Sequence, residues 1–181
     1  RLMAYSSIGH IGYALAGVAT ASKTGYDGSI IYITIYAVMN IGAFSCIFLM
    51  KKDGRYTEKI SDLAGISKTN PLIAIAFLII LFSLAGIPPL GGFFAKFYVF
   101  MSVIENGMYA LAVIGLLTTV VSAFYYLRII KIIYFDELIR PLDPVKNFNI
   151  SGTIFVSCII LITFFLYPSF LSNIVNLISL N

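Results

Sequence analysis

The sequence has very little charge for its length and no tryptophan. Only 11% of its 181 residues are charged and 60% are hydrophobic, whereas soluble globular proteins carry about 25% charged residues. This balance excludes a soluble globular domain and predicts a polytopic membrane protein whose helix bundle has lipid as its outer solvent. No segment resembles a cleaved signal peptide. Because tryptophan is absent, the twelve tyrosines are the candidates for aromatic belts at the membrane interfaces.

Cysteine, histidine and nucleotide-binding motifs are also scarce. Cys46 and Cys158 each lie in an apolar run, which favours packing residues over a disulfide or a metal pair. His10 is the only histidine, so no histidine pair exists for haem and no cysteine cluster for iron–sulfur binding. Neither GxGxxG after a strand nor GxxxxGK[ST] occurs. We therefore expect no metal, redox cofactor or nucleotide hydrolysis in this chain.

The chain contains five apolar segments. They cover residues 2–21, 29–50, 71–104, 108–135 and 150–167, the last followed by Pro168 and an apolar tail to residue 180. The third is too long for one straight span, which needs about 20 residues. Pro88 and Pro89 lack amide hydrogens and interrupt it among several glycines. The sequence thus predicts an all-α polytopic membrane protein with five transmembrane segments, the third broken at Pro88-Pro89.

Basic residues gather in alternate loops, which predicts orientation rather than nucleic-acid binding. The net charge is +4, and the basic residues concentrate at Arg1, in loop 51–70 and in the stretch 128–148. The positive-inside rule places these regions on the cytoplasmic or matrix side and the C-terminus opposite. The chain also begins without Met, immediately inside an apolar run, so we expect a fragment of a longer protein.

Two regions are interpreted as surface structure. Tyr125, Tyr126 and Arg128 lie near the basic end of the fourth segment and are interpreted as interfacial anchors. Residues 56–66 are expected to form a short surface helix capped by Thr57.

Lys96 is the most informative residue. The only other charge between Thr69 and Leu127 is Glu105, and a charge in an apolar run costs several kcal/mol unless it is paired or hydrated. It follows the expected helix break, whose first half-helix would direct its negative dipole end toward it. Its own helix offers no acidic neighbour. This position favours proton handling; a snorkelling lysine or a static ion pair is the alternative.

A second polar feature lies in the first segment. Ser6, His10 and Tyr13 recur at helical spacing, and Ser7 lies beside them. In a membrane helix such a stripe faces the bundle interior, either as a hydrated path or as a hydrogen-bonded seam between helices. On composition alone, a packed histidine satisfied by a neighbouring helix remains the alternative.

Three stretches of sequence resemble a known family. They are RLMAYSSIGHIGYALAG at 1–17, FSLAGIPPLGGFFAKFYVF at 82–100 and FYYLRIIKIIYFD at 124–136. Together they are similar to the proton-pumping antiporter-like membrane subunits of respiratory complex I. The KFYVF continuation after the glycines looks like the N-type branch of this family, called chain 2 in mitochondria.

The resemblance implies the C-terminal part of an antiporter-like inverted-repeat fold. Residues 1–135 would belong to the second repeat, and residues 136–181 would form a loop and the final transmembrane helix. The four spans of the repeat part lie near 1–21, 28–50, 71–104 (broken) and 107–135. The family's other key residues, a glutamate and further lysines, would precede Arg1. The N-terminal half that carries them would come from a separate chain or from the same polypeptide.

The resemblance also implies site roles. Lys96 matches the family's lysine on a broken helix, a proton-channel residue, and His10 matches a polar position on the hydrophilic axis of the membrane domain. Ser6, Ser7 and Tyr13 would support this axis, and Pro88 with Pro89 would act at the break as supporting or gating residues.

The implied function is proton translocation within NADH:ubiquinone oxidoreductase, by a subunit without a redox centre. FMN, iron–sulfur clusters and quinone would lie in or between other subunits. The expected partners are the other membrane subunits, especially the neighbouring M-type and K-type subunits, and lipids, in a mitochondrial inner membrane or a bacterial plasma membrane. The alternatives are a subunit of a multi-subunit sodium/proton antiporter and a structural membrane scaffold.

Overall fold

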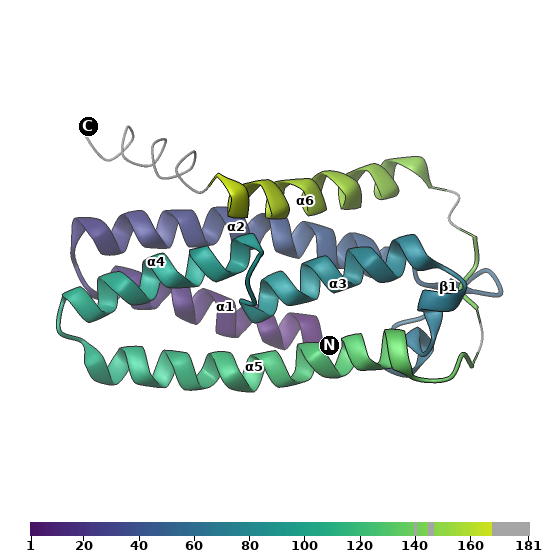
Figure 1. Ribbon diagram of the computed structural model, residues 1–181, viewed down its shortest axis with the longest axis horizontal. Helices are drawn as coiled ribbons and strands as arrows, with labels where there is room; N and C mark the ends of the chain where they lie inside the picture. Colours follow the sequence, from purple (N-terminus) through teal and green to yellow (C-terminus); the bar gives the residue numbers. More distant parts are fainter. Residues whose placement is uncertain (140, 145–146, 168–181) are drawn as a thin grey trace.

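The protein is a bundle of long helices with one small hairpin at its end (Figure 1). The computed structural model describes residues 1–139, 141–144 and 147–167. The helices are α1 (Leu2–Ala19), α2 (Lys23–Phe48), α3 (Pro71–Ala85), α4 (Gly91–Glu105), α5 (Tyr109–Phe135) and α6 (Phe148–Leu166), with strands β1 (Lys51–Lys52) and β2 (Arg55–Tyr56) and short 3₁₀ helices η1 (Ile60–Leu63) and η2 (Ile66–Lys68).

Helix α2 lies at the centre of the bundle and packs against α1, α3, α4 and α6. It begins before the expected residue 28 because Ser22 caps it, accepting a hydrogen bond from the Gly25 amide at 3.1 Å. Tyr32 and Met39 on this helix have no exposed surface. The central position of α2 therefore brings the inward faces of α1 and α4 close to one another.

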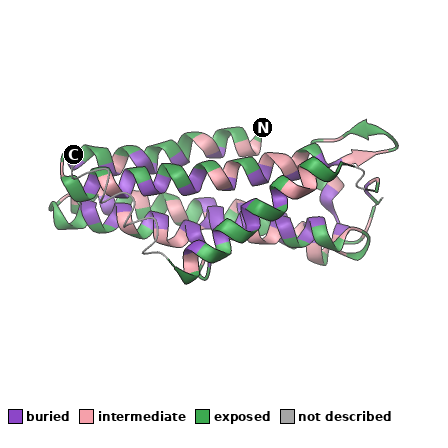
Figure 2. Ribbon diagram, turned by 90° about the horizontal axis from the view of Figure 1, so that it is seen from above, coloured by how far each residue is buried: buried purple, intermediate pink, exposed green. Residues whose placement is uncertain are grey.

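The outer surface of the bundle is apolar. Figure 2 shows exposed residues along the outside of the helices and buried residues between them. On α5 the exposed apolar side chains include Val113, Leu117, Val120, Val121 and Phe124. An apolar surface of this extent is covered by lipid or by other protein.

Among the described residues, three helices are long and apolar enough to cross a membrane by themselves: α2, α5 and α6. A fourth span is reached if the 3₁₀ region 60–68 and α3, which bend by 119° relative to each other, are counted as one. The multi-pass membrane character expected from composition is confirmed. Between α3 and α4 the chain leaves helical geometry over residues 86–90, and α4 continues along the bundle where α3 ends (Figure 1).

The loop between α2 and α3 differs from the expectation. The predicted surface helix over 56–66 is wrong: this stretch starts at the last residue of β2, contains η1 and ends at the first residue of η2, and β1 pairs antiparallel with β2. Gly65 adopts φ +67°, and its amide donates to the Ile132 carbonyl of α5 at 3.0 Å. A continuous helix is excluded because Gly65 is left-handed and its amide bonds to another element.

The basic loops meet at one end of the bundle (Figure 1). The Asp143 carboxylate accepts from the amides of Asp53 and Gly54, at 3.1 and 2.8 Å, and the Asp143 amide donates to the Lys51 carbonyl. Loop 51–70 and the stretch after α5 therefore pack together. Arg140, Lys146 and the expected continuation of the last helix over 168–180 lie outside the described residues.

Candidate functional site

Lys96 lies on the inner face of α4, where only 5% of its surface is exposed. Its ammonium donates to the carbonyls of Leu84 and Ala85, at 3.0 and 3.1 Å. These carbonyls belong to the last turn of α3, where the helix ends and main-chain oxygens have no partner in the next turn. The lysine therefore caps the negative end of α3, the helix end whose dipole the sequence predicts to lie near it.

The glycines of the connection permit this approach. Gly86 ends α3 with φ +82°, and a Cβ there would lie 3.0 Å from the Lys96 Cδ. A Cβ on Gly92 would lie 1.8 Å from the Ser83 carbonyl oxygen, and the Gly92 amide donates to the Ser83 hydroxyl at 3.0 Å. The first turn of α4 is thus pressed against the last turn of α3, which sets the distance from Lys96 to the open carbonyls.

No carboxylate pairs with Lys96 within the described part of the chain. The two ion pairs found there lie at the basic end of the bundle: Lys52–Asp62 joins β1 to η1, and Lys131–Asp136 joins the end of α5 to the residue that follows it. The ammonium lies instead 5.0 Å from the centroid of the Tyr13 ring on α1. An aromatic face and two carbonyl dipoles stabilise a cation without neutralising it.

His10 lies on α1 one helical turn from Tyr13 and is 2% exposed. Its Nδ1 lies 2.7 Å from the Tyr32 hydroxyl and its Nε2 lies 3.0 Å from the Tyr126 hydroxyl. Tyr126 is also hydrogen-bonded to Ser6. The ring of Tyr36 stacks on the imidazole, with centroids 4.7 Å apart and planes inclined by 14°. Helices α1, α2 and α5 therefore all contribute to the surroundings of one histidine.

Tyr13 contacts both halves of the site. Its ring meets the His10 ring edge-on, with centroids 6.0 Å apart, and the Lys96 ammonium lies 5.0 Å from its centroid. Its hydroxyl lies 3.2 Å from the Thr118 hydroxyl and accepts from Thr119 at 3.1 Å. Lys96 and His10 are thus joined through one aromatic ring whose hydroxyl is held by α5.

A groove of about 440 Å³ separates α1 from α5 beside these residues. Ser6, His10 and Tyr13 line it from α1, and Thr118 and Ser122 line it from α5, among apolar and glycine positions. Polar side chains at this depth between two apolar helices give water and protons a surface to bind.

The structure brings together four of the residues that the sequence singled out, Lys96, His10, Ser6 and Tyr13. Ser7 is only half buried and its hydroxyl donates to the Met3 carbonyl of its own helix at 3.0 Å. Pro88 and Pro89 are exposed within the described chain, and the peptide between them is cis. Within the described residues, no side-chain hydrogen bond joins Ser7, Pro88 or Pro89 to Lys96 or His10.

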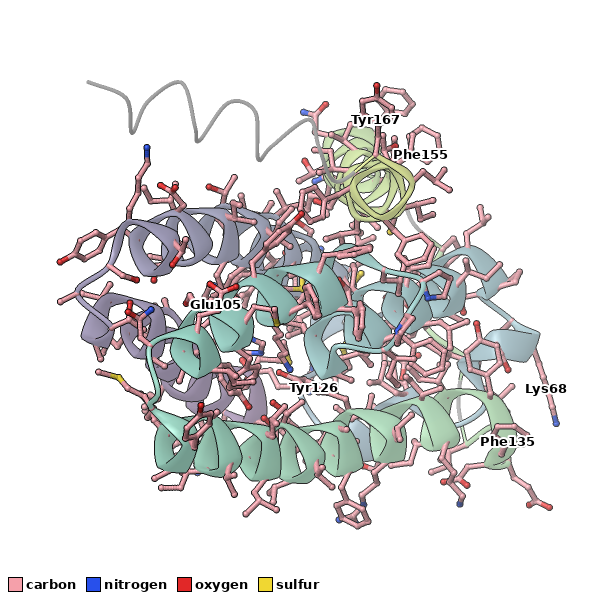
Figure 3. All side chains as sticks on the ribbon, turned by 60° about the vertical axis from the view of Figure 1, so that its left-hand side comes forward. Lys68, Glu105, Tyr126, Phe135, Phe155 and Tyr167 are labelled. Carbon is pink, nitrogen blue, oxygen red and sulfur yellow. The ribbon has the colours of Figure 1, made fainter. Side chains whose placement is uncertain are left out.

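Three tyrosines of the site were missed. Tyr126 is fully buried on the inner side of α5 (Figure 3), so its interpretation as an interfacial anchor is wrong. Tyr32 and Tyr36 were not singled out at all. Together with Ser29 they form a polar stripe at helical spacing on α2, the same signal that identified His10 on α1.

The described residues contain no group of three or more His, Cys, Asp or Glu side chains that could hold a metal ion. The ionisable groups that meet at the site are a lysine, a histidine and phenols. Such groups can exchange protons and form hydrogen bonds, so the arrangement has the chemical groups that proton handling requires.

Sequence comparison identifies one matching family model. The family described as NADH:quinone oxidoreductase/Mrp antiporter, TM, matches residues 1–122. NADH-quinone oxidoreductase subunit N of Pelagibacter ubique is 52% identical over 180 residues, covering 99% of this chain and 38% of the relative. Subunit N of Rhodospirillum rubrum is 52% identical over 169 residues, covering 93% of this chain and 35% of the relative. The chain therefore spans less than two fifths of the length of these relatives, in their C-terminal part.

Solved structures agree with the sequence match. A chain of respiratory complex I from Thermus thermophilus with bound aureothin is similar with a TM-score of 0.82 and 28% identity, covering 96% of this chain and 39% of that one. A chain of the Mrp complex from Dietzia sp. has the same TM-score at 20% identity, covering 94% of this chain and 40% of that one. The second likeness shows a shared fold alone.

Proposed function

Because the chain belongs to the NADH:quinone oxidoreductase/Mrp antiporter membrane family, we propose that it is a proton-translocating membrane part of respiratory complex I. In this proposal electron transfer from NADH to quinone takes place in other subunits. The FMN, iron–sulfur clusters and quinone lie there or between those subunits, and this chain moves protons. The observation that carries the proposal is the buried Lys96 ammonium, held by carbonyls at the junction of two helices and by an aromatic face.

The lysine is suited to this role because the described residues around it stabilise the charge without a fixed counter-ion among them. A static ion pair keeps a proton permanently, since removing either partner leaves an uncompensated buried charge. Carbonyl dipoles and a ring hold the ammonium more weakly, so a change in nearby charge or hydration shifts its protonation. His10 is connected to it through Tyr13, which gives a proton a neighbouring group. In this proposal Lys96 and His10 transfer protons, Ser6, Ser7 and Tyr13 support them, and Pro88 with Pro89 shape the break.

The proposal includes five membrane spans, with α3 and α4 forming one broken span. Each has 15 residues, or about 22 Å at 1.5 Å per residue, too short to cross a hydrocarbon core of about 30 Å alone. They follow one another along the bundle between α2 and α5 (Figure 1). Helix α1 is the first span and α6 begins the last. Residues 1–135 then belong to the second antiporter-like repeat and residues 136–181 to a loop and the final helix.

The orientation follows from the basic loops. Loop 51–70 and the stretch after α5 are joined by the Asp143 hydrogen bonds at one end of the bundle, so both lie on one side of the membrane. By the positive-inside rule this is the cytoplasmic or matrix side. We place the protein in a bacterial plasma membrane or a mitochondrial inner membrane. Its proposed protein partners are the other complex I membrane subunits, especially the M-type and K-type neighbours. It also pairs with the part that corresponds to the N-terminal half of the relatives, and with lipids.

The competing function is a subunit of a sodium/proton antiporter complex. The Dietzia Mrp chain has the same fold at 20% identity, whereas relatives named subunit N reach 52%. The difference in identity favours complex I. A structural scaffold is the remaining alternative, and it requires no role for the Lys96 charge.

Substitution Lys96→Ala in the full-length protein, within the assembled complex in sealed vesicles, tests the proposal. We expect assembly to be retained and proton pumping per NADH oxidised to fall at least about tenfold, as expected for losing one essential acid–base group. The matched control is Lys68→Ala, since Lys68 is an exposed lysine at the end of the bundle (Figure 3). Normal pumping by an assembled Lys96→Ala variant refutes the proton-transfer role.

A further inference from the structure

The hydrogen bonds around His10 have a definite direction. A neutral imidazole carries one N–H donor and one acceptor nitrogen, and both nitrogens of His10 face tyrosine hydroxyls, Tyr32 at Nδ1 and Tyr126 at Nε2. Which nitrogen carries the hydrogen therefore depends on which hydroxyl has to donate.

The surroundings of Tyr32 show which nitrogen of His10 carries the hydrogen. Its side chain has no exposed surface, and within the described chain its hydroxyl has one hydrogen-bond partner, His10 Nδ1. If Nδ1 carried the hydrogen, the hydrogen of the Tyr32 hydroxyl would be buried without an acceptor, which is unfavourable. Tyr32 therefore donates to Nδ1, and the imidazole hydrogen is on Nε2.

Tyr126 extends this series of hydrogen bonds from His10 toward Ser6. Nε2–H donates to the Tyr126 oxygen, so the Tyr126 hydrogen is free to bond to Ser6. Ser6 lines the groove between α1 and α5. At its other end the series of hydrogen bonds stops at Tyr32, whose hydroxyl has no further partner within the described residues. His10 is thus connected by hydrogen bonds to the groove through Tyr126 and Ser6.

We propose that Tyr32 and Tyr126 are positioning residues of the proton path: Tyr32 fixes His10 as its Nε2–H tautomer, and Tyr126 links that nitrogen to Ser6 and the groove. In this tautomer His10 has no free acceptor facing Tyr126. Transfer of a proton from Tyr126 to Nε2 is therefore blocked as long as Tyr32 donates to Nδ1. The inference rests on the proposed function, because it assigns these tyrosines to the same proton transfer.

The groups that titrate around His10 come from several helices. Tyr13 lies on its own helix, Tyr32 and Tyr36 on α2, and Tyr126 on α5. Lys96 is the charged neighbour, on the far side of Tyr13.

The experiment removes single hydroxyls and keeps every ring. Tyr126→Phe and Tyr32→Phe are made in the full-length protein, assembled in the complex and sealed in vesicles, and proton pumping is measured per NADH oxidised. We expect each to reduce this ratio about fivefold, the factor that one hydrogen bond typically represents. Tyr134→Phe is the matched control: it removes a hydroxyl from α5, the helix of Tyr126, that has no hydrogen-bond partner in the described structure, and pumping is expected to stay unchanged.

A double-mutant cycle separates positioning from packing. Positioning residues act through the imidazole, so Tyr126→Phe and Tyr32→Phe should have no further effect in a His10→Gln background. Three outcomes overturn the inference. Effects that add in that background, or loss of assembly in both single variants, assign the hydroxyls to packing. Unchanged pumping in both single variants assigns them no role. Lys96→Ala is measured in parallel: if it alone lowers pumping, only the tyrosine inference fails, whereas if no variant lowers pumping the proposed function fails as well.

Discussion

The ammonium of Lys96 on α4 lies 5.0 Å from the centroid of the Tyr13 ring on α1. The two residues are far apart in the sequence, and α2 brings their helices together by packing against both. The same ring meets His10 edge-on. Tyr13 therefore contacts both the lysine and the histidine, and its ring rather than its hydroxyl makes both contacts.

Replacing Tyr13 by leucine is expected to weaken the site while replacement by phenylalanine preserves most of it. A cation over an aromatic face gains about 0.5–2 kcal/mol, and Tyr13→Leu loses that gain together with the contact to His10. Tyr13→Phe keeps the ring and loses the hydrogen bonds to Thr118 and Thr119. Pumping per NADH oxidised, measured in vesicles, should fall several-fold for leucine and less for phenylalanine. Equal pumping by the two variants would show that the ring does not contribute.

Gly92→Ala is expected to disrupt the junction of α3 and α4. Its Cβ would lie 1.8 Å from the Ser83 carbonyl oxygen, so the first turn of α4 has to move away, at a cost of about 1–3 kcal/mol or more. Lys96 on the same helix would then lose its carbonyl partners. The amount of assembled complex in native gels and its thermal inactivation midpoint measure the effect.

Gly152→Ala is the matched control, because a Cβ at Gly152 meets nothing within 4 Å in the described structure. Alanine is favoured over glycine inside a helix by about 1 kcal/mol. We expect unchanged or slightly improved stability at this position. Normal assembly of Gly92→Ala would contradict the close contact between the two half-helices.

Cysteine labelling tests the orientation. Lys68 and Glu105 lie at opposite ends of the bundle (Figure 3) and both are exposed, whereas the native Cys46 and Cys158 are buried. With a membrane-impermeant maleimide, Lys68→Cys should react from the cytoplasmic or matrix side and Glu105→Cys from the outer side, as compared in inside-out and right-side-out vesicles. Reversed labelling of both positions would invert the proposed topology.

Much of the site could be predicted because its polar residues stand out against apolar helices. Lys96 and the stripe around His10 were visible for this reason, and the family resemblance drawn from their motifs is confirmed by the family match and the subunit N relatives. Tyr126 could not be placed in the same way. A tyrosine beside Arg128 at the basic end of a span satisfies the rule for interfacial anchors, and only its contacts with Ser6 and His10 show that it faces inward.

The loop structure was also beyond sequence patterns. Hydrophobic spacing over 56–66 is compatible with a short helix, but the Gly65 amide bonds to α5 and Asp143 holds the hairpin loop at Asp53 and Gly54. These partners lie far away in the sequence. Local propensity is a weak prior where such long-range hydrogen bonds compete with it.

The sequence by itself determined that this is a membrane helix bundle, which segments are apolar, and that a lysine follows a proline and glycine break. Those conclusions depend on composition and local spacing, because lipid tolerates few charges and a proline cannot donate a hydrogen bond. The tertiary structure decided which groups meet Lys96 and His10. Two carbonyls of α3, the Tyr13 ring and the hydroxyls of Tyr32 and Tyr126 meet Lys96 and His10 only when α1, α2, α3, α4 and α5 pack together. Helix packing fixes these contacts because each is made by side chains and helix ends from different elements, whose relative rotation no local pattern specifies.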